Sequence, residues 1–157
     1  MNINIVAVGK IKESYYRQAC DEYIKMLGRF ACVKVHEIPD EPLSNIKSEA
    51  DEKKALMKEA SLVIPKLRGF VVVLDIKGRK MDSVEFAGKI KDIMLDGNSD
   101  ITFVIGSSCG LHESVKSKAD LRLSFSDMTM PHRLFRVVLL EQIYRAFKIL
   151  SGETYHK

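Results

Sequence analysis

The sequence predicts an α/β fold with a mostly parallel sheet and helices on both of its faces. Five short runs rich in Val and Ile alternate with stretches in which apolar residues recur every three or four positions, as strands and amphipathic helices do. Two of the runs, residues 70–74 and 101–105, are apolar at almost every position, which is typical of central parallel strands. Alternation of the two kinds of element favours a parallel sheet flanked by helices.

The strands are expected at residues 3–8, 32–38, 70–74, 101–105 and 121–125. The first helix follows Ser14, a candidate cap, and shares one apolar face between Tyr16, Ala19, Cys20, Tyr23, Leu27 and Phe30. The second covers about residues 48–64 and ends at Pro65. Its inward side chains are expected to be Leu56, Met57, Ala60 and Val63. Each helix therefore has one face to bury against the sheet.

The third helix begins with the capping-box-like residues 82–85 (DSVE) and stops at Gly97. Its inward side chains are expected to be Phe86, Ile90, Ile93 and Met94. The last helix covers about residues 133–150, after Pro131, and its apolar stripe comprises Leu140, Ile143, Tyr144, Phe147 and Leu150. We expect that stripe to pack in the core or against a second copy of the chain.

Composition excludes several classes of protein. The 157 residues suit one domain, and 46% hydrophobic with 29% charged residues excludes a mainly disordered chain. No apolar stretch approaches the roughly 20 residues that cross a bilayer, so we expect no membrane span. Three cysteines without a Cys-x-x-Cys pair argue against a disulfide framework or a thiolate zinc site and favour a reducing cytoplasm. The four histidines show no metal-ligand spacing, so we expect no metal.

Ligands of parallel α/β sheets bind beyond the carboxyl ends of the strands. Here that edge comprises residues 75–79, 106–110 and 126–131. Residues 106–110 (GSSCG) lack the spacing of a dinucleotide or Walker A loop, but their two glycines permit a tight turn with main-chain groups facing a ligand. Residues 77–80 (KGRK) could contact phosphate or form a solvated turn. We therefore expect the chemistry at these loops.

The same GSSCG segment also matches the G-x-S-x-G nucleophile elbow of hydrolases. A serine hydrolase would use Ser108, with Asp120 or Asp127 as the acid and His132 as the base. The chain is short for that fold and lacks an oxyanion-hole glycine run after an earlier strand. A non-catalytic ribosome-binding module is a further alternative, since residues from 132 onward carry +3 of the formal net charge of +4.

Several motifs in order resemble those of the RlmH family of SPOUT-class methyltransferases, over the whole chain and most specifically in its C-terminal third. They are Leu74-Asp75, Ile105-Gly106 with Gly110-Leu111, Ser124-x-Ser126-x-Met128-Thr129-x-Pro131-His132, Arg136-Val137, Glu141-Gln142-x-Tyr144-Arg145-Ala146, and the terminal Tyr155-His156. The resemblance implies a single SPOUT methyltransferase domain over residues 1–157 with a deep trefoil knot in its C-terminal part, S-adenosylmethionine (SAM) as methyl donor, and a cytoplasmic homodimer. It also implies methylation of N3 of a pseudouridine in 23S ribosomal RNA (rRNA) on the assembled ribosome.

Carried over by position, the resemblance implies that the cofactor is bound by Leu74, Gly106, Ser107, Gly110, Ser126, Asp127, Met128, Thr129, Met130 and Pro131. The family usually has a glycine where this chain has Ser107, so one close contact differs. Catalysis or RNA positioning is assigned to His132, Arg145, Tyr155 and His156. We expect His132 or His156 to accept or orient a proton, Arg145 to meet phosphate or a base carbonyl, and Tyr155 to stack on a base.

Overall fold

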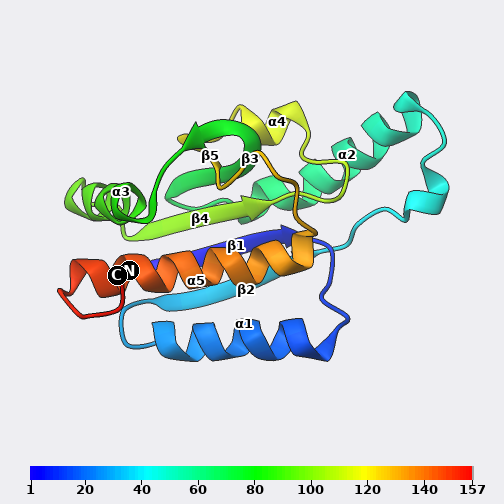
Figure 1. The fold of residues 1–157 in the computed structure, drawn as a ribbon. Coiled ribbons are helices and arrows are strands. Elements are labelled where there is room, and N and C mark those ends of the chain that lie inside the picture. The colour runs from blue at the N-terminus through cyan, green and yellow to red at the C-terminus, as the bar shows by residue number, and fades with distance from the viewer. Residues whose placement is uncertain (157) are drawn as a thin grey trace.

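A computed structural model describes residues 1–156 and shows one five-stranded sheet in the order β2-β1-β4-β3-β5, with every neighbouring pair parallel (Figure 1). Its strands are β1 (Asn2–Val8), β2 (Cys32–Ile38), β3 (Phe70–Lys80), β4 (Asp100–Ile105) and β5 (Leu121–Ser124). Its helices are α1 (Ser14–Leu27), α2 (Glu49–Val63), α3 (Ser83–Leu95), α4 (Glu113–Lys116) and α5 (His132–Leu150), with the 3₁₀ turns η1 (Leu43–Asn45) and η2 (Ile64–Lys66). The predicted parallel α/β fold is confirmed, and all five strands lie where the apolar runs predict them.

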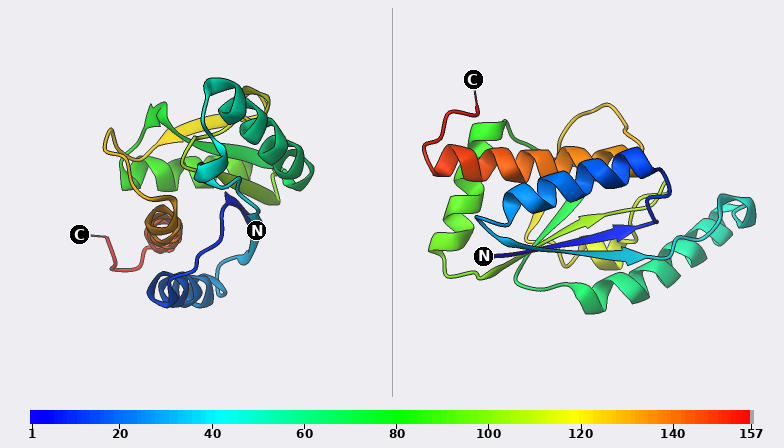
Figure 2. Two further views of the ribbon diagram at one scale, coloured as in Figure 1. Left: turned by 90° about the vertical axis from the view of Figure 1, so that its right-hand side faces the viewer. Right: turned by 90° about the horizontal axis from the view of Figure 1, so that it is seen from below.

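Helices cover both faces of the sheet, because alternate side chains of each strand point to opposite sides. One face carries α1, α3 and α5, whose apolar residues pack with Ile3, Ile5, Ile101 and Phe103. The other face carries α2 and α4, which pack on Val6, Val73 and Val104. Figure 2 shows α5 and α1 side by side on their shared face. The buried central strands thus lie between two apolar layers.

Four local expectations were wrong. Ser14 is the first residue of α1 rather than its cap, because Glu13 occupies the N-cap position. Phe30 lies beyond the end of α1, although its ring stacks on Phe147 at a centroid distance of 5.5 Å. Met57 and Met94 are exposed by 53% and 41%, because α2 and α3 bury narrower stripes than their apolar periodicity indicates.

Strand β3 is longer than expected. Its pairing with β5 slips between Leu74 and Arg79, so that residues 75–78 form a bulge and the strand resumes to Lys80. Gly78 lies so close to the Arg122 main chain that a Cβ there would approach it to 2.6 Å. Residues 77–80 are therefore part of a strand with a bulge and not a solvated turn, which was one of the two alternatives; the phosphate contact stays a prediction.

The connection from β5 leads from one edge of the sheet to α5, whose first residue lies beside the end of β1. Helix α5 then passes back along α1 and α3. The trefoil knot in this part of the chain stays a prediction. Within residues 1–156, no helix is long and apolar enough to cross a membrane.

Candidate functional site

The three loops singled out in the sequence lie at one edge of the sheet. Strands β3, β4 and β1 are adjacent and parallel, so that Leu74 and Gly106 follow neighbouring strand ends. The segment after β5 joins this edge through an ion pair between Lys80 of β3 and Asp127. Because neighbouring strands lie about 4.8 Å apart, the predicted cofactor-binding segments come together as expected from the parallel topology.

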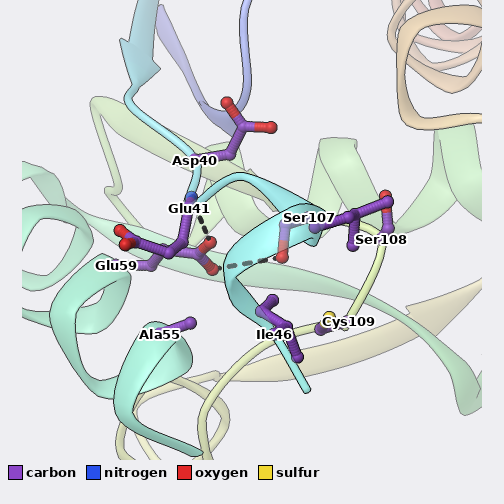
Figure 3. A pocket seen from close by; sticks show the side chains of 9 residues that line it. Asp40, Glu41, Ile46, Ala55, Glu59, Ser107, Ser108 and Cys109 are labelled. Atoms are coloured by element: carbon purple, nitrogen blue, oxygen red, sulfur yellow. Dashed lines mark hydrogen bonds between the residues drawn. The ribbon is translucent and has the colours of Figure 1, made fainter. Parts of the chain in front are cut away.

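The turn at residues 106–110 is compact. The Gly110 N–H donates to the Ser107 carbonyl at 2.9 Å, and Gly110 adopts a φ of +85°, which favours glycine. A Cβ on Gly106 would come within 2.6 Å of the Gly110 carbonyl oxygen. The side chain of Ser107 turns aside to donate to Glu59 Oε2 at 3.1 Å (Figure 3). The turn therefore requires glycine at both ends, while the serine is accommodated by a contact with α2.

The segment from Ser124 to Pro131 has its own local hydrogen bonds. Ser124 Oγ donates to the Ser126 carbonyl at 3.2 Å, and Ser126 Oγ accepts from the Met128 N–H at 3.0 Å. Met128 is 78% exposed. The segment thus presents main-chain groups and an apolar side chain at the surface beside the strand ends.

A cavity of about 330 Å³ opens between this segment, α3 and α5. Its lining residues are Met81, Asp82, Ser83, Phe86, Leu123, Phe125, Met130, Val138 and Gln142. Aromatic and aliphatic walls with a few polar groups suit a ligand that has a flat base and polar substituents. The lining residues therefore fit SAM. Of the predicted cofactor residues, Met130 lines the cavity.

Most of that lining was missed in the sequence. Asp82 and Ser83 were interpreted only as a helix start, and Gln142 only as part of a family motif. Ser83 Oγ donates to Gln142 Oε1 at 2.7 Å, which joins the start of α3 to the middle of α5. The signal available was the position of the capping box directly after a strand, at the edge where ligands bind.

His132, the first residue of α5, is held against the end of β1. Its Nδ1 lies 3.1 Å from the Val8 carbonyl oxygen, and its ring packs on Gly9, whose φ is +100°. A carbonyl only accepts hydrogen bonds, so Nδ1 carries the proton and Nε2 of the neutral ring is an acceptor. Burial, followed by the charges of Arg133 and Arg136, lowers the pKa of His132. The arrangement keeps the imidazole neutral.

The other three predicted catalytic residues form a cluster at the far end of α5. Arg145 pairs with Glu141 at 2.6 Å, lies 4.8 Å from the Tyr155 ring centroid, and contacts His156 Nδ1 at 3.3 Å. Tyr155 packs edge-on against Tyr144. Arg145 and His132 lie roughly 20 Å apart at 1.5 Å of rise per residue. One protomer therefore does not bring all four predicted residues together.

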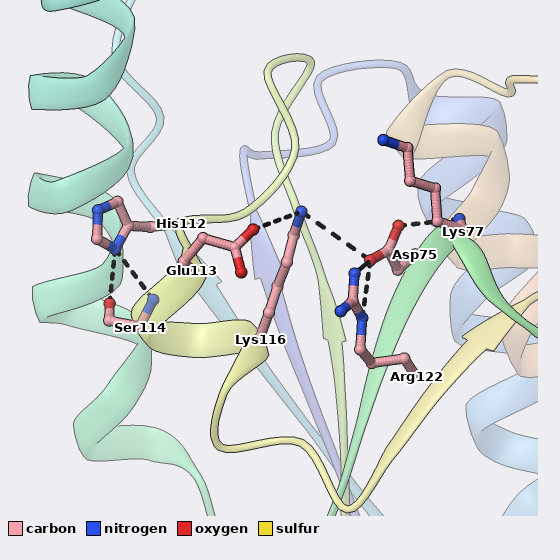
Figure 4. Close-up of polar contacts among 7 residues, drawn as sticks. All are labelled: Asp75, Lys77, His112, Glu113, Ser114, Lys116 and Arg122. Carbon is pink, nitrogen blue, oxygen red and sulfur yellow. Dashed lines mark hydrogen bonds and ion pairs between the residues drawn. The ribbon is translucent and has the colours of Figure 1, made fainter.

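The carboxylate of Asp75, a buried acidic group, lies beside the bulge of β3 and contacts the cationic side chains of Arg122 and Lys116 (Figure 4). It accepts from Arg122 Nε at 3.0 Å and from the Lys77 N–H at 3.0 Å, with Lys116 at 3.9 Å. Burial opposes its ionisation, but the hydrogen bonds from Arg122 and Lys77 prevail and lower the pKa of Asp75. Lys77 and Arg79 remain exposed at this edge.

The arrangement argues against the hydrolase alternative. Asp120 Oδ2 accepts from the Val71 N–H at 2.8 Å, at the amino end of β3 and away from the turn that holds Ser108. His132 is directed to Val8 instead of Ser108.

Among residues 1–156, no group of three or more His, Cys, Asp or Glu side chains is placed to hold a metal ion.

Comparisons with known proteins show the family and the fold. Residues 1–156 match a family model described as predicted SPOUT methyltransferase. Ribosomal RNA large subunit methyltransferase H of Clostridium botulinum is 49% identical over 159 residues, covering 100% of both chains. The fold resembles a probable methylase family protein from Haemophilus influenzae (TM-score 0.54, 15% identity, 99% of this chain and 70% of that one). It also resembles the putative methyltransferase Lpg2936 from Legionella pneumophila, whose structure was solved with bound SAM. The TM-score is 0.51 and the identity 9%, and the match covers 94% of this chain and 66% of that one.

Proposed function

The chain belongs to the SPOUT methyltransferase family, and from this premise we propose that it methylates 23S rRNA with SAM as methyl donor. The proposed target is N3 of a pseudouridine on the assembled ribosome, which places the enzyme in the cytoplasm. The observation that carries the proposal is the meeting of three segments that match family motifs: Leu74 and Gly106 at neighbouring strand ends, and residues 126–131, which the Lys80–Asp127 ion pair joins to the same edge. The name of the 49% identical relative supports rRNA as the substrate.

We assign cofactor binding to Leu74, the turn at Gly106, Ser107 and Gly110, and the segment Ser126, Asp127, Met128, Thr129, Met130 and Pro131. The adjoining cavity adds Phe86, Phe125 and Gln142 to that set. Its apolar walls suit the adenine, and its polar rim suits the hydroxyl and amino groups. When bound, SAM supplies a methyl group already activated by its sulfonium charge. The protein therefore has mainly to align the acceptor nitrogen and remove its proton.

His132 is the residue best placed to accept that proton. Its ring stands at the cofactor edge, and the Val8 carbonyl fixes the tautomer that leaves Nε2 unprotonated. Burial and two neighbouring arginines keep the ring neutral by lowering its pKa. An acceptor whose pKa lies below neutrality is in its reactive form throughout the physiological range. His156 is exposed and lies at the other end of α5.

Arg145, Tyr155 and His156 form the proposed RNA-positioning group. The Tyr155 ring offers a face for base stacking, and Arg145 offers a guanidinium for phosphate or a base carbonyl. The exposed cations Lys77 and Arg79 are suited to further phosphate contacts. The distance between Arg145 and His132 is bridged if α5 packs antiparallel to its copy across a two-fold axis, so that each protomer's C-terminal residues reach its partner's cofactor edge.

The test is tritium transfer from labelled SAM to three substrates: intact ribosomes, naked rRNA, and ribosomes lacking pseudouridine at the target loop. We expect transfer only to intact pseudouridylated ribosomes. Transfer to naked rRNA would overturn the ribosome requirement, and transfer without pseudouridine would overturn the target. With SAM bound but no transfer to any of the three, the target lies elsewhere. Without SAM binding, a non-catalytic ribosome-binding module replaces the proposal.

A further inference from the structure

We propose that Glu59 is a positioning residue for the cofactor turn, and that its carboxylate fixes residues 106–110 by holding the Ser107 hydroxyl against α2. The inference rests on the proposed function, since it assigns the purpose of this contact to SAM binding. It concerns a side chain that none of the motifs in the chain indicates. Glu59 lies in α2 on the face of the sheet opposite α5, so it takes no part in the substrate contacts proposed above.

The carboxylate joins three segments that are distant in the sequence. Glu59 Oε2 accepts from Ser107 Oγ at 3.1 Å, and Glu59 Oε1 accepts from the Glu41 N–H at 3.3 Å (Figure 3). The residue is only 5% exposed. A cavity of about 10 Å³ lies between these groups, lined also by Ser108 and Cys109. Each carboxylate oxygen thus accepts one hydrogen bond, one from the turn and one from the segment that follows β2.

Stability alone does not account for a carboxylate at this place. Burying a charge is costly unless it is paired, and the nearest lysine on the same helix, Lys58, pairs with Glu41 instead. Among the ion pairs found in residues 1–156, none includes Glu59. Burial accordingly raises the pKa of Glu59. A buried acid that contacts a loop beside the strand ends is a candidate functional group.

The contact with Glu59 acts on the turn through Ser107. The turn is closed by the Gly110 N–H bond to the Ser107 carbonyl, and Gly106 packs on Gly110. Its side-chain tether to the rest of the protein is the Ser107 hydroxyl on Glu59. The Ser107 hydroxyl gives this chain a side-chain hydrogen bond that holds the turn, which a glycine at this position would lack. Pre-ordering of a binding loop reduces the entropy lost on ligand binding.

The test compares Glu59→Leu, Glu59→Gln, Ser107→Ala and the Leu/Ala double variant, with Glu52→Gln as control. Glu52 is an exposed glutamate on the same helix. The readouts are the SAM Kd by calorimetry, amide exchange of residues 106–111 in cofactor-free protein, and Tm. Leucine nearly fills the volume without hydrogen bonds. Glutamine can still accept from the Glu41 N–H and donate its amide to Ser107 Oγ, so it is the conservative variant.

We expect Glu59→Leu and Ser107→Ala each to weaken SAM binding about tenfold, as expected for one lost hydrogen bond to a charged group, and to speed exchange at 106–111. The double variant should be no more than twofold worse than either single variant, because both remove one interaction. Glu59→Gln and the control should stay within twofold of the native protein. Additive effects, or Kd and exchange unchanged in Glu59→Leu, would overturn the proposal.

Failure of the proposed function gives a different result. If the native protein binds no SAM, the cofactor assignment fails and with it the purpose given to Glu59, whereas exchange at 106–111 still shows whether Glu59 orders the turn. If the native protein binds SAM and exchange changes across all of α2 and β4 together with a large fall in Tm, Glu59 is structural and the positioning role is excluded.

Discussion

At the scale of single residues, the site depends on how closely main chain and side chains approach each other. His132 packs directly on Gly9, and the hydrogen bond to Val8 leaves its ring only one tautomer. Arg136, which is 5% exposed, donates to the Gly9 carbonyl at 3.0 Å and pairs with Glu37 at 2.6 Å. The end of β1 therefore packs closely against the first turns of α5. We expect substitutions at this contact to affect methyl transfer.

Gly9→Ala should impair both folding and methyl transfer. A Cβ at this position would lie 2.4 Å from His132 Cε1, in addition to the cost of a positive φ. We expect a loss of about 2–3 kcal/mol in the free energy of unfolding, measured with urea, and a lower transfer rate. Gly97→Ala is the matched control, because Gly97 has φ +84° and open space around it. Equal losses in the two variants would show that the His132 ring yields without cost.

The pH dependence of His132 has a definite sign. Its pKa is lowered by burial and then by Arg133 and Arg136, so folding favours the neutral ring. The resulting stability is present above the unfolded pKa of about 6.5 and is lost as pH falls through the folded value. We expect the Cε1 proton of His132 to titrate in NMR below pH 6.5, and transfer to fall with the same midpoint. A midpoint above 6.5 would contradict this assignment.

Arg145→Ala should separate RNA binding from cofactor binding. Arg145 holds Glu141, Tyr155 and His156 far from the cofactor edge of its own protomer. Removing it should weaken binding to ribosomes about tenfold while the SAM Kd changes less than twofold, as for one charge-assisted contact. Filter binding and calorimetry measure the two quantities. Lys91→Ala, which removes an exposed cation from α3, is the control. Unchanged ribosome binding by Arg145→Ala would exclude the role assigned to it.

At the scale of secondary-structure elements, capping places the start of α3 beside the cavity. Asp82 accepts from the Glu85 N–H at 2.8 Å, while Glu85 Oε2 accepts from the Asp82 N–H at 2.9 Å. The capping box in the sequence is thus confirmed, and it fixes Ser83 opposite Gln142. Ser48 caps α2 in the same way, by accepting from the Asp51 N–H. Local sequence determines where these two helices begin.

Asp82→Ala should destabilise α3 and the cavity edge together. Loss of an N-cap side chain costs about 1 kcal/mol, which corresponds to a fall in Tm of about 2–4 °C for a chain of this length. Asp92→Ala, at an exposed position within the same helix, should leave Tm nearly unchanged. Thermal unfolding by circular dichroism measures both variants. Equal Tm values for them would mean that the capping box contributes nothing measurable.

At the scale of the whole molecule, α5 carries proposed functional residues at both of its ends. Leu134, near its first turn, lies half-buried on the same helix as Glu141 and Arg145. The two functional ends of α5 also lie too far apart to act together in one protomer. A second copy packed across α5 would cover Leu134 and bring the two ends into one site.

We therefore predict a dimer at micromolar concentration by light scattering. Leu134→Asp should shift the protein toward monomer, because a carboxylate cannot be buried in an apolar interface without a partner. It should also reduce transfer more strongly than SAM binding, since the partner's C-terminal residues would be lost. Leu95→Asp, at a position 73% exposed on α3, is the control. A monomeric native protein would exclude the two-protomer site.

The sequence by itself determined the strands, their parallel arrangement, the loops at their carboxyl ends and the capping box of α3, because local periodicity and turn chemistry carry that information. Through family resemblance it also predicted that Gly106 binds the cofactor and that His132 acts in catalysis. Only the tertiary structure decided that β3 continues past its bulge, that Met57 and Met94 face solvent, and that Glu59 reaches Ser107. These depend on contacts between segments far apart in the chain, which no local pattern of residues encodes.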